Sequence, residues 1–132
     1  MGKMPSLNSD AQIDQMAFKV NTSTKVADYT VKASESGTFF CNRGATAAVN
    51  FTLPAVASGL NYLFYGAADL AVTVTPAAAD TLICDDNVAA DAIALSTGSE
   101  IMGGAIQVVC DGTKWFAMTY LEESQTVVVT SA

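Results

Sequence analysis

The segment VVCDGTKWFAM, residues 108–118, gathers several side chains that could take part in chemistry. It contains the thiol of Cys110, the carboxylate of Asp111, the amine of Lys114 and the chain's only tryptophan, Trp115. A cysteine nucleophile needs a base to activate it, and the chain contains no histidine. An Asp-Gly pair between two apolar runs is, by contrast, a strong signal for a β-hairpin. The segment therefore predicts a turn between two strands and no reaction centre.

The predicted turn has two central residues, Asp111 and Gly112, and this length sets the register of the hairpin. Val108 then faces Trp115, on a side of the hairpin that carries aliphatic residues. We expect this side to face the core, where a large indole ring packs best. Phe116 falls on the opposite side because side chains alternate along a strand.

A second group of polar residues offers oxygen ligands to a hard cation. The group consists of Asp85, Asp86, Asn87 and Asp91. These residues lack the spacing and the glycine of an EF-hand loop, and the same residue types favour turns through local hydrogen bonds. We favour a solvated loop, and a cation site at residues 85–91 stays an open alternative. We expect no catalytic residue, no cofactor and no enzymatic activity.

Composition and charge exclude several classes of partner. The chain of 132 residues has the size of one domain, and its 51% hydrophobic content permits a packed core. The net charge is −7 and the six cations form no cluster, so we expect no nucleic-acid partner. No apolar run approaches the ~20 residues of a membrane-spanning helix, so we expect no membrane partner. The three cysteines form no C-x-x-C pair and are expected to be buried, reduced thiols of a protein made in a cytoplasm.

Short runs with alternating apolar residues follow one another along most of the chain, with turn signals between them. In the clearest run, Val49, Phe51 and Leu53 share one face. No long helical pattern interrupts these runs. We therefore predict an all-β fold, an antiparallel β-sandwich that is jelly-roll-like and carries an extended N-terminal arm. The predicted division is an arm at 1–24, the β-sandwich domain at 25–121 and a C-terminal tail or edge strand at 122–132.

The first 24 residues are polar and contain few apolar side chains. Ile13, Met16 and Val20 share a face if the segment is helical, whereas Met16, Phe18 and Val20 share a face if it is extended. Both conformations stay open. In either one, the candidates to anchor the arm on another surface are Ile13, Met16, Phe18 and Val20.

The run LNYLFYG at residues 60–66 is apolar on both faces. A strand at the surface of a sandwich normally needs only one apolar face. Either another segment of the chain or a neighbouring subunit must cover the second face, and tyrosines are enriched at subunit interfaces. We take Tyr62, Leu63, Phe64 and Tyr65 as candidates for an oligomer interface.

Four segments, in this order along the chain, resemble small β-domains on the virion surface of tailed bacteriophages. They are YTVKASESG at 29–37, NRGATAAVNFTLP at 42–54, ADTL at 79–82 and VVCDGTKW at 108–115. The resemblance covers roughly residues 28–118 and carries over no catalytic residue. It implies a compact β-domain, often trimeric, that serves as a head decoration (cement) protein or as part of a fibre.

A chain with one small domain suits a separate decoration protein better than a complete fibre. The expected function is therefore that of a non-enzymatic structural protein, a homotrimer bound to the major capsid protein on the capsid exterior and made in the host cytoplasm. A negative surface fits that exterior position better than contact with a packaged genome. The alternative is a receptor- or glycan-binding module of a fibre or spike, which exposed tyrosine or tryptophan platforms would favour.

Overall fold

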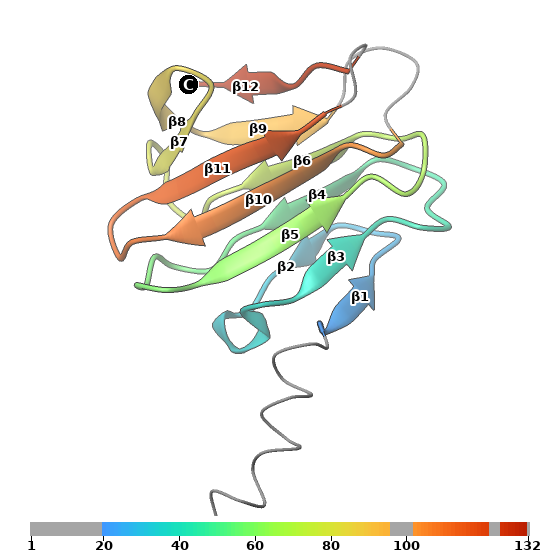
Figure 1. Cartoon of the computed structure of the whole chain (residues 1–132), viewed down its shortest axis with the longest axis horizontal. Helices are drawn as coiled ribbons and strands as arrows, with labels where there is room; N and C mark the ends of the chain where they lie inside the picture. The colour runs from blue at the N-terminus through green and yellow to red at the C-terminus, as the bar shows by residue number, and fades with distance from the viewer. Residues whose placement is uncertain (1–19, 96–101, 122–124, 132) are drawn as a thin grey trace, which may run out of the picture.

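The chain folds into two β-sheets that pack face to face (Figure 1). The computed structural model describes residues 20–95, 102–121 and 125–131. In spatial order, the seven-stranded sheet contains β1 (Thr22–Thr24), β3 (Phe39–Cys41), β5 (Asn61–Tyr65), β10 (Ala105–Cys110), β11 (Trp115–Tyr120), β7 (Leu82–Cys84) and β8 (Asn87–Ala90). The five-stranded sheet contains β12 (Val128–Thr130), β9 (Ala92–Leu95), β6 (Val72–Thr75), β4 (Val49–Thr52) and β2 (Tyr29–Thr30). A single 3-10 turn, η1 (Ala33–Glu35), follows β2 among the described residues.

The all-β sandwich is confirmed, but the prediction of antiparallel sheets is wrong. Among the described residues, five of the ten strand pairings are parallel, and the other five are antiparallel. The cause is the path of the chain, which changes sheet at every connection from β1 to β7. Turn signals that resemble hairpin turns in the sequence therefore connect strands of opposite sheets, so that alternate strands run parallel within each sheet. A jelly roll is built from antiparallel pairs, so this part of the prediction is also wrong.

The ends of the domain differ from the predicted boundaries. Thr22–Thr24, which we predicted as part of the arm, form β1 at the edge of the seven-stranded sheet. At the other end, β12 pairs with β9 and closes one edge of the five-stranded sheet. Val127 and Val129 pack against the core, so the tail carries the edge strand that the sequence predicted.

The hairpin formed by β10 and β11 has a register that differs from the prediction. Val108 pairs with Ala117, and Trp115 pairs with Cys110, which is a shift of two residues. Because side chains alternate with a period of two, this shift leaves each side chain on its predicted face. Val108 and Trp115 are both fully buried.

The turn of this hairpin is set by the side chain of Asp111. Its carboxylate accepts hydrogen bonds from the backbone N–H groups of Thr113 and Lys114, both at 2.8 Å. Both bonds lower the pKa of the Asp111 carboxyl, and the bond from Lys114 has the larger effect. The central residues are therefore Gly112 and Thr113, and Gly112 supplies the positive φ of 101° that the turn requires.

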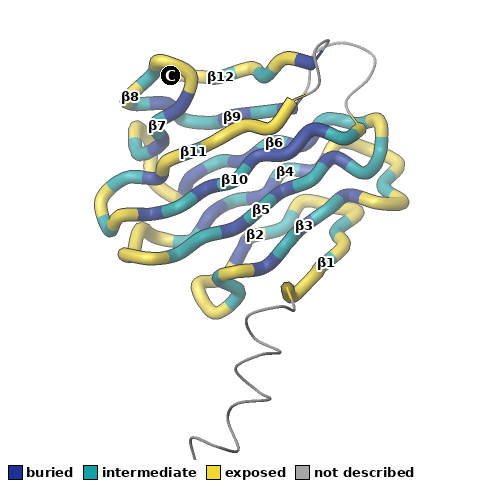
Figure 2. The backbone as a smooth tube through the Cα atoms, viewed as in Figure 1, coloured by how far each residue is buried: buried dark blue, intermediate teal, exposed yellow. Residues whose placement is uncertain are grey.

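Buried positions alternate along the strands of both sheets (Figure 2). An aromatic cluster fills the space between the two sheets. Phe51 of the five-stranded sheet contacts Phe64 and Phe40 of the seven-stranded sheet, with ring centroids 4.8 and 5.5 Å apart. Tyr62 extends the cluster to Trp115, whose ring lies 6.0 Å away. The inward positions of both sheets thus form one continuous core.

The hydroxyl of Tyr62 is the polar part of this cluster. It donates a hydrogen bond of 2.9 Å to the backbone carbonyl of Lys32. Burial raises the pKa of Tyr62 to about 12, with smaller contributions from the negative charge of Glu35 and from Cys110. The neutral phenol is therefore favoured in the folded protein.

We expect Trp115→Ala to lower the free energy of unfolding by about 3–5 kcal/mol, because it removes a fully buried ring and leaves a cavity. Phe116→Ala is the matched control, since the neighbouring ring lies on the outer face and is partly exposed. Its cost should be about 1 kcal/mol or less. Denaturant unfolding of both variants measures the difference, and similar losses would contradict the assignment of faces.

We expect stability to decrease above pH 10 and Tyr62→Phe to make this decrease smaller. The folded-state pKa of Tyr62 is higher than the value of 10 in the unfolded chain. The contribution of the neutral phenol is therefore complete below pH 10 and is lost as the pH rises toward 12. Urea midpoints between pH 8 and about 11.5 measure the effect. An identical pH profile for Tyr62→Phe would show that Tyr62 does not carry it.

Candidate functional site

The two outer faces of the sandwich differ in chemistry. On the five-stranded sheet, β4 and β6 present Asn50, Thr52, Thr73 and Thr75 outward, and their positions pair across the two parallel strands. The hydroxyl of Thr75 donates to the Asn50 amide oxygen at 2.8 Å, and the Asn50 amide nitrogen lies 3.3 Å from the Thr52 hydroxyl. This part of the face has the polar character that a solvated sheet normally has. Toward β9 and β12 the face carries Ala94 and the 40% exposed Val128.

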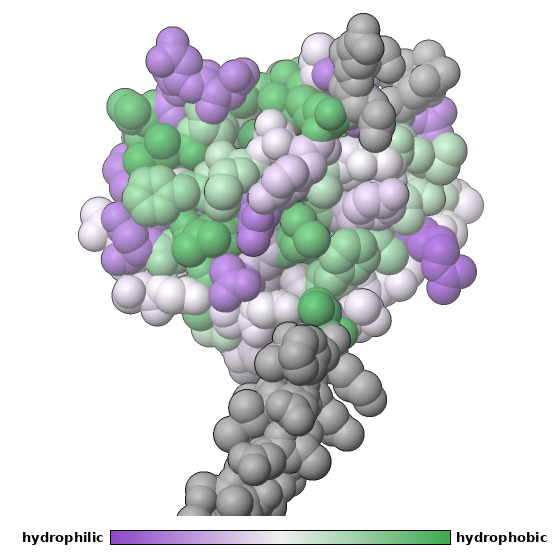
Figure 3. All heavy atoms as spheres, in the orientation of Figure 1, coloured by the Kyte–Doolittle hydropathy of each residue, from purple (hydrophilic) through white to green (hydrophobic). Residues whose placement is uncertain are grey.

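The outer face of the seven-stranded sheet is mostly apolar. Residues that alternate with the core positions of β3, β5, β10 and β11 form this face. They are Phe39, Cys41, Asn61, Leu63, Tyr65, Ala105, Gln107, Val109, Phe116, Met118 and Tyr120. None of them is charged. Figure 3 shows this face with several apolar areas around a few polar side chains, and the polar members include Asn61 and Gln107.

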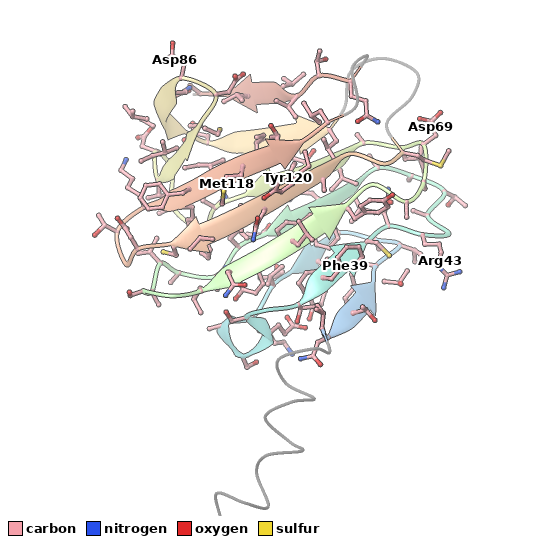
Figure 4. All side chains as sticks on the ribbon, viewed as in Figure 1. Phe39, Arg43, Asp69, Asp86, Met118 and Tyr120 are labelled. Carbon is pink, nitrogen blue, oxygen red and sulfur yellow. The ribbon has the colours of Figure 1, made fainter. Side chains whose placement is uncertain are left out.

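Charged side chains lie around this face rather than on it. Figure 4 shows Phe39, Met118 and Tyr120 across the strands, while Arg43, Asp69 and Asp86 lie at the periphery of the view. The last three residues are exposed positions in loops. An apolar sheet face framed by charged loops is a candidate for contact with another surface.

The predicted interface residues divide between the core and this outer face. Tyr62 and Phe64 are 1% and 0% exposed, so both are core residues and neither is accessible to another subunit. Leu63 and Tyr65 lie on the outer face and are partly buried. The alternation along β5 explains the division, because four consecutive residues of a strand cannot share one face.

The most exposed part of the outer face lies on β11, which is not among the site residues predicted from the sequence. Phe116, Met118 and Tyr120 are 39%, 41% and 52% exposed, and we call these three residues the β11 patch. The Tyr120 hydroxyl donates to the Gln107 amide oxygen at 2.7 Å. The sequence signal for this patch is the run WFAMTYL at residues 115–121, which places bulky apolar residues on both faces of one strand.

A groove crosses the opposite half of the same face. Its volume is about 410 Å³, and its lining includes Val20, Thr22, Phe39, Leu63 and Gln107. The last four lie in one row across β1, β3, β5 and β10. The groove thus continues the apolar face toward the point where the described part of the chain begins.

Of the predicted arm anchors, only Val20 lies within the described residues. Its side chain is 64% exposed and lies at the groove. Ile13, Met16 and Phe18 lie outside the described residues.

The cysteines are held as free thiols. Burial raises the pKa of Cys84, and the nearby Asp85 carboxylate raises it further. Cys110 is buried behind the hairpin turn, where its sulfur accepts the Gly112 N–H at 3.4 Å. A raised pKa and burial both oppose formation of a reactive thiolate.

The acidic loops form local structural contacts. The Asp91 carboxylate accepts the backbone N–H of Asp80 at 2.8 Å, and the Asn87 amide oxygen accepts that of Ala89 at 2.9 Å. The amine of Lys114 reaches the carbonyls of Asp80 and Val88. Within the described residues, no group of three or more cysteine, aspartate or glutamate side chains is placed to hold a metal ion.

The outer face of the seven-stranded sheet therefore combines apolar rings and aliphatic groups with a few amides and hydroxyls. This chemistry can bind another apolar surface by burial and can orient it through hydrogen bonds. No helix among the described residues is long and apolar enough to cross a membrane. Comparison with models of known protein families finds no match, and comparison with curated protein sequences finds none.

Proposed function

We propose that this protein is a non-enzymatic structural protein of a bacteriophage virion, which binds the outer surface of the capsid as a homotrimer. The observation that carries the proposal is the apolar, uncharged outer face of the seven-stranded sheet, with the β11 patch as its most exposed part. On the opposite sheet, by contrast, the outer side chains of β4 and β6 are threonines and an asparagine that form hydrogen bonds with one another. The sequence resemblance to virion-surface β-domains supplies the biological setting.

The charge distribution favours an uncharged face as the contact between copies. Each chain carries a net charge of −7, so two copies repel each other at long range. Ions screen such repulsion beyond about 8–10 Å at ordinary salt concentrations. A contact through an uncharged face therefore avoids burying like charges, and the self-association surface is assigned to the β11 patch.

Stabilisation of the capsid follows from binding linkage. A protein that binds the assembled shell, and does not bind free shell subunits, stabilises the shell by mass action. A trimer can attach through three equivalent contacts, so that weak individual contacts add up to firm attachment. The partner is the major capsid protein, and the anchors in this proposal are Ile13, Met16, Phe18 and Val20.

The second candidate function is glycan or receptor binding by a fibre or spike. The observation that favours it is the pair formed by Tyr120 and Gln107, in which a 52% exposed ring lies beside an amide on a sheet face. Exposed rings with neighbouring hydrogen-bonding groups suit a sugar surface. Images of particles with and without the protein distinguish the two functions, because decoration adds density to the shell and a fibre adds density to the tail.

We expect the isolated protein to be a trimer and Met118→Asp to dissociate it. A buried carboxylate without a partner is costly, and Met118 lies in the middle of the β11 patch. Thr73→Asp is the control because it places the same charge on the polar face of the five-stranded sheet. Sedimentation equilibrium measures the mass of each variant, and circular dichroism checks that both are folded. A monomeric wild-type protein at micromolar concentration would contradict the proposal.

We expect deletion of residues 1–19 to leave a folded domain that attaches weakly to capsids. All described strands lie after this segment, whereas the proposed shell anchors lie mostly within it. Particles that lack the protein should lose their genome at a lower temperature, and full-length protein should restore their heat resistance. If the truncated protein occupies shells fully and protects them equally well, the shell contact lies on the β-domain.

A further inference from the structure

We propose that, in the free protein, the groove on the seven-stranded sheet binds Met16 and Phe18 of the chain's own N-terminal segment. This inference concerns the unattached protein and goes beyond the proposed capsid function. The groove, the point where the described chain begins and the pattern of the preceding residues carry it together.

The groove lies at the point where the segment joins the domain. Thr22, Phe39, Leu63 and Gln107 occupy successive positions of one cross-strand row. Val20 lines the same groove two residues before β1. The row crosses the strands, whereas the backbone at Asn21 and Thr22 still runs along β3. The chain that precedes Val20 therefore has to turn across β1 to follow the row.

The segment is long enough to reach the middle of the row. Neighbouring strands lie about 4.8 Å apart, so the three steps from β1 to β10 cover roughly 14 Å. An extended residue spans about 3.3 Å, so the four residues from Val20 back to Met16 cover roughly 13 Å. Val20 lies two residues, or roughly 7 Å, before Thr22 along β1, so an extended segment that turns at Val20 can carry Met16 about as far as Leu63 on β5.

The spacing of the apolar residues also fits. In an extended segment, Met16, Phe18 and Val20 point to the same side because side chains alternate with a period of two. Val20 already lines the groove, so the same side of the segment faces the row. Lys19 then points away from the groove and keeps its amine in water.

The groove has the chemistry that these side chains require. Phe39 and Leu63 provide apolar surface, and the groove lining carries no charge. Phe18 can pack against the Phe39 ring, and the flexible thioether of Met16 can adapt to the irregular surface between Leu63 and Gln107. A charged occupant would find no partner there.

The occupant is the chain's own segment because attachment makes the contact intramolecular. The segment is tethered two residues before β1 of its own domain and is present at the groove at a high effective concentration. Docking covers apolar surface of the free protein. On the capsid the same side chains would leave the groove and bind the shell, so attachment would exchange one apolar surface for another.

Trypsin cleavage after Lys19 tests the docking in the full-length protein. A protease needs an extended, accessible segment on both sides of the cleaved bond, so docking of Met16 and Phe18 should slow cleavage at Lys19. Leu63→Asp removes the groove surface and should accelerate release of the segment by about tenfold, because cleavage follows the population of the undocked form. Arg43 lies in an exposed loop, and cleavage there is the internal control.

Two further variants keep the result independent of effects on folding. Met16→Asp acts from the segment and leaves the groove intact, and it should accelerate cleavage at Lys19 as Leu63→Asp does. Thr73→Asp places the same charge on the outer face of the five-stranded sheet and should leave the rate unchanged. Equal rates of cleavage at Lys19 in the wild type, Leu63→Asp and Met16→Asp would overturn the proposal.

Dilution distinguishes the chain's own segment from that of a neighbour. Protection should stay constant over an about hundredfold range of protein concentration in the Met118→Asp variant, which is expected to be monomeric, because intramolecular docking does not depend on concentration. Protection that disappears on dilution would assign the groove to a neighbouring copy and overturn the proposal. These measurements use the isolated protein, so their failure is separate from failure of the particle experiments.

Discussion

The contact of Phe51 with Phe40 and Phe64 is the interaction on which the sandwich depends. The three rings come from β4, β3 and β5, which are consecutive along the chain and lie in alternate sheets. Each crossing between sheets therefore brings the next inward ring against the previous one. This local interleaving lets β1, β3 and β5 pair in parallel without the long crossover connections that parallel strands usually need. Tyr62 of β5 and Trp115 of β11 then extend the same cluster along the seven-stranded sheet.

The interleaved core leaves two outer faces to be used in different ways. The row of threonines and asparagine on β4 and β6 forms hydrogen bonds within its own sheet. The face of the seven-stranded sheet carries Phe39, Phe116 and Met118 instead. Loss of solubility is the usual cost of such a face. Charged loops around it, together with the net charge of −7, oppose nonspecific association.

The alternation of apolar and polar residues predicted the all-β fold class and the side chains that face the core. It did not predict which strands pair with one another. The buried positions Val49, Phe51 and Leu53 follow from period two alone. The order of the strands in each sheet does not follow from this pattern. A short turn has the same sequence signals whether it joins two strands of one sheet or connects one sheet to the other. The hairpin register was missed for a local reason: the Asp111 carboxylate takes two backbone N–H groups and moves the turn by one residue.

The same alternation explains how much of the candidate site was accessible from sequence. The two-faced character of Tyr62–Tyr65 correctly pointed to an apolar outer face, but half of those residues belong to the core. The β11 patch needs one more fact, namely that β11 lies between β10 and β7 in the interior of the sheet. The outer side chains of an interior strand lie in the middle of the sheet face. Phe116, Met118 and Tyr120 must therefore either face water or meet a partner, and three large side chains in a row favour the partner.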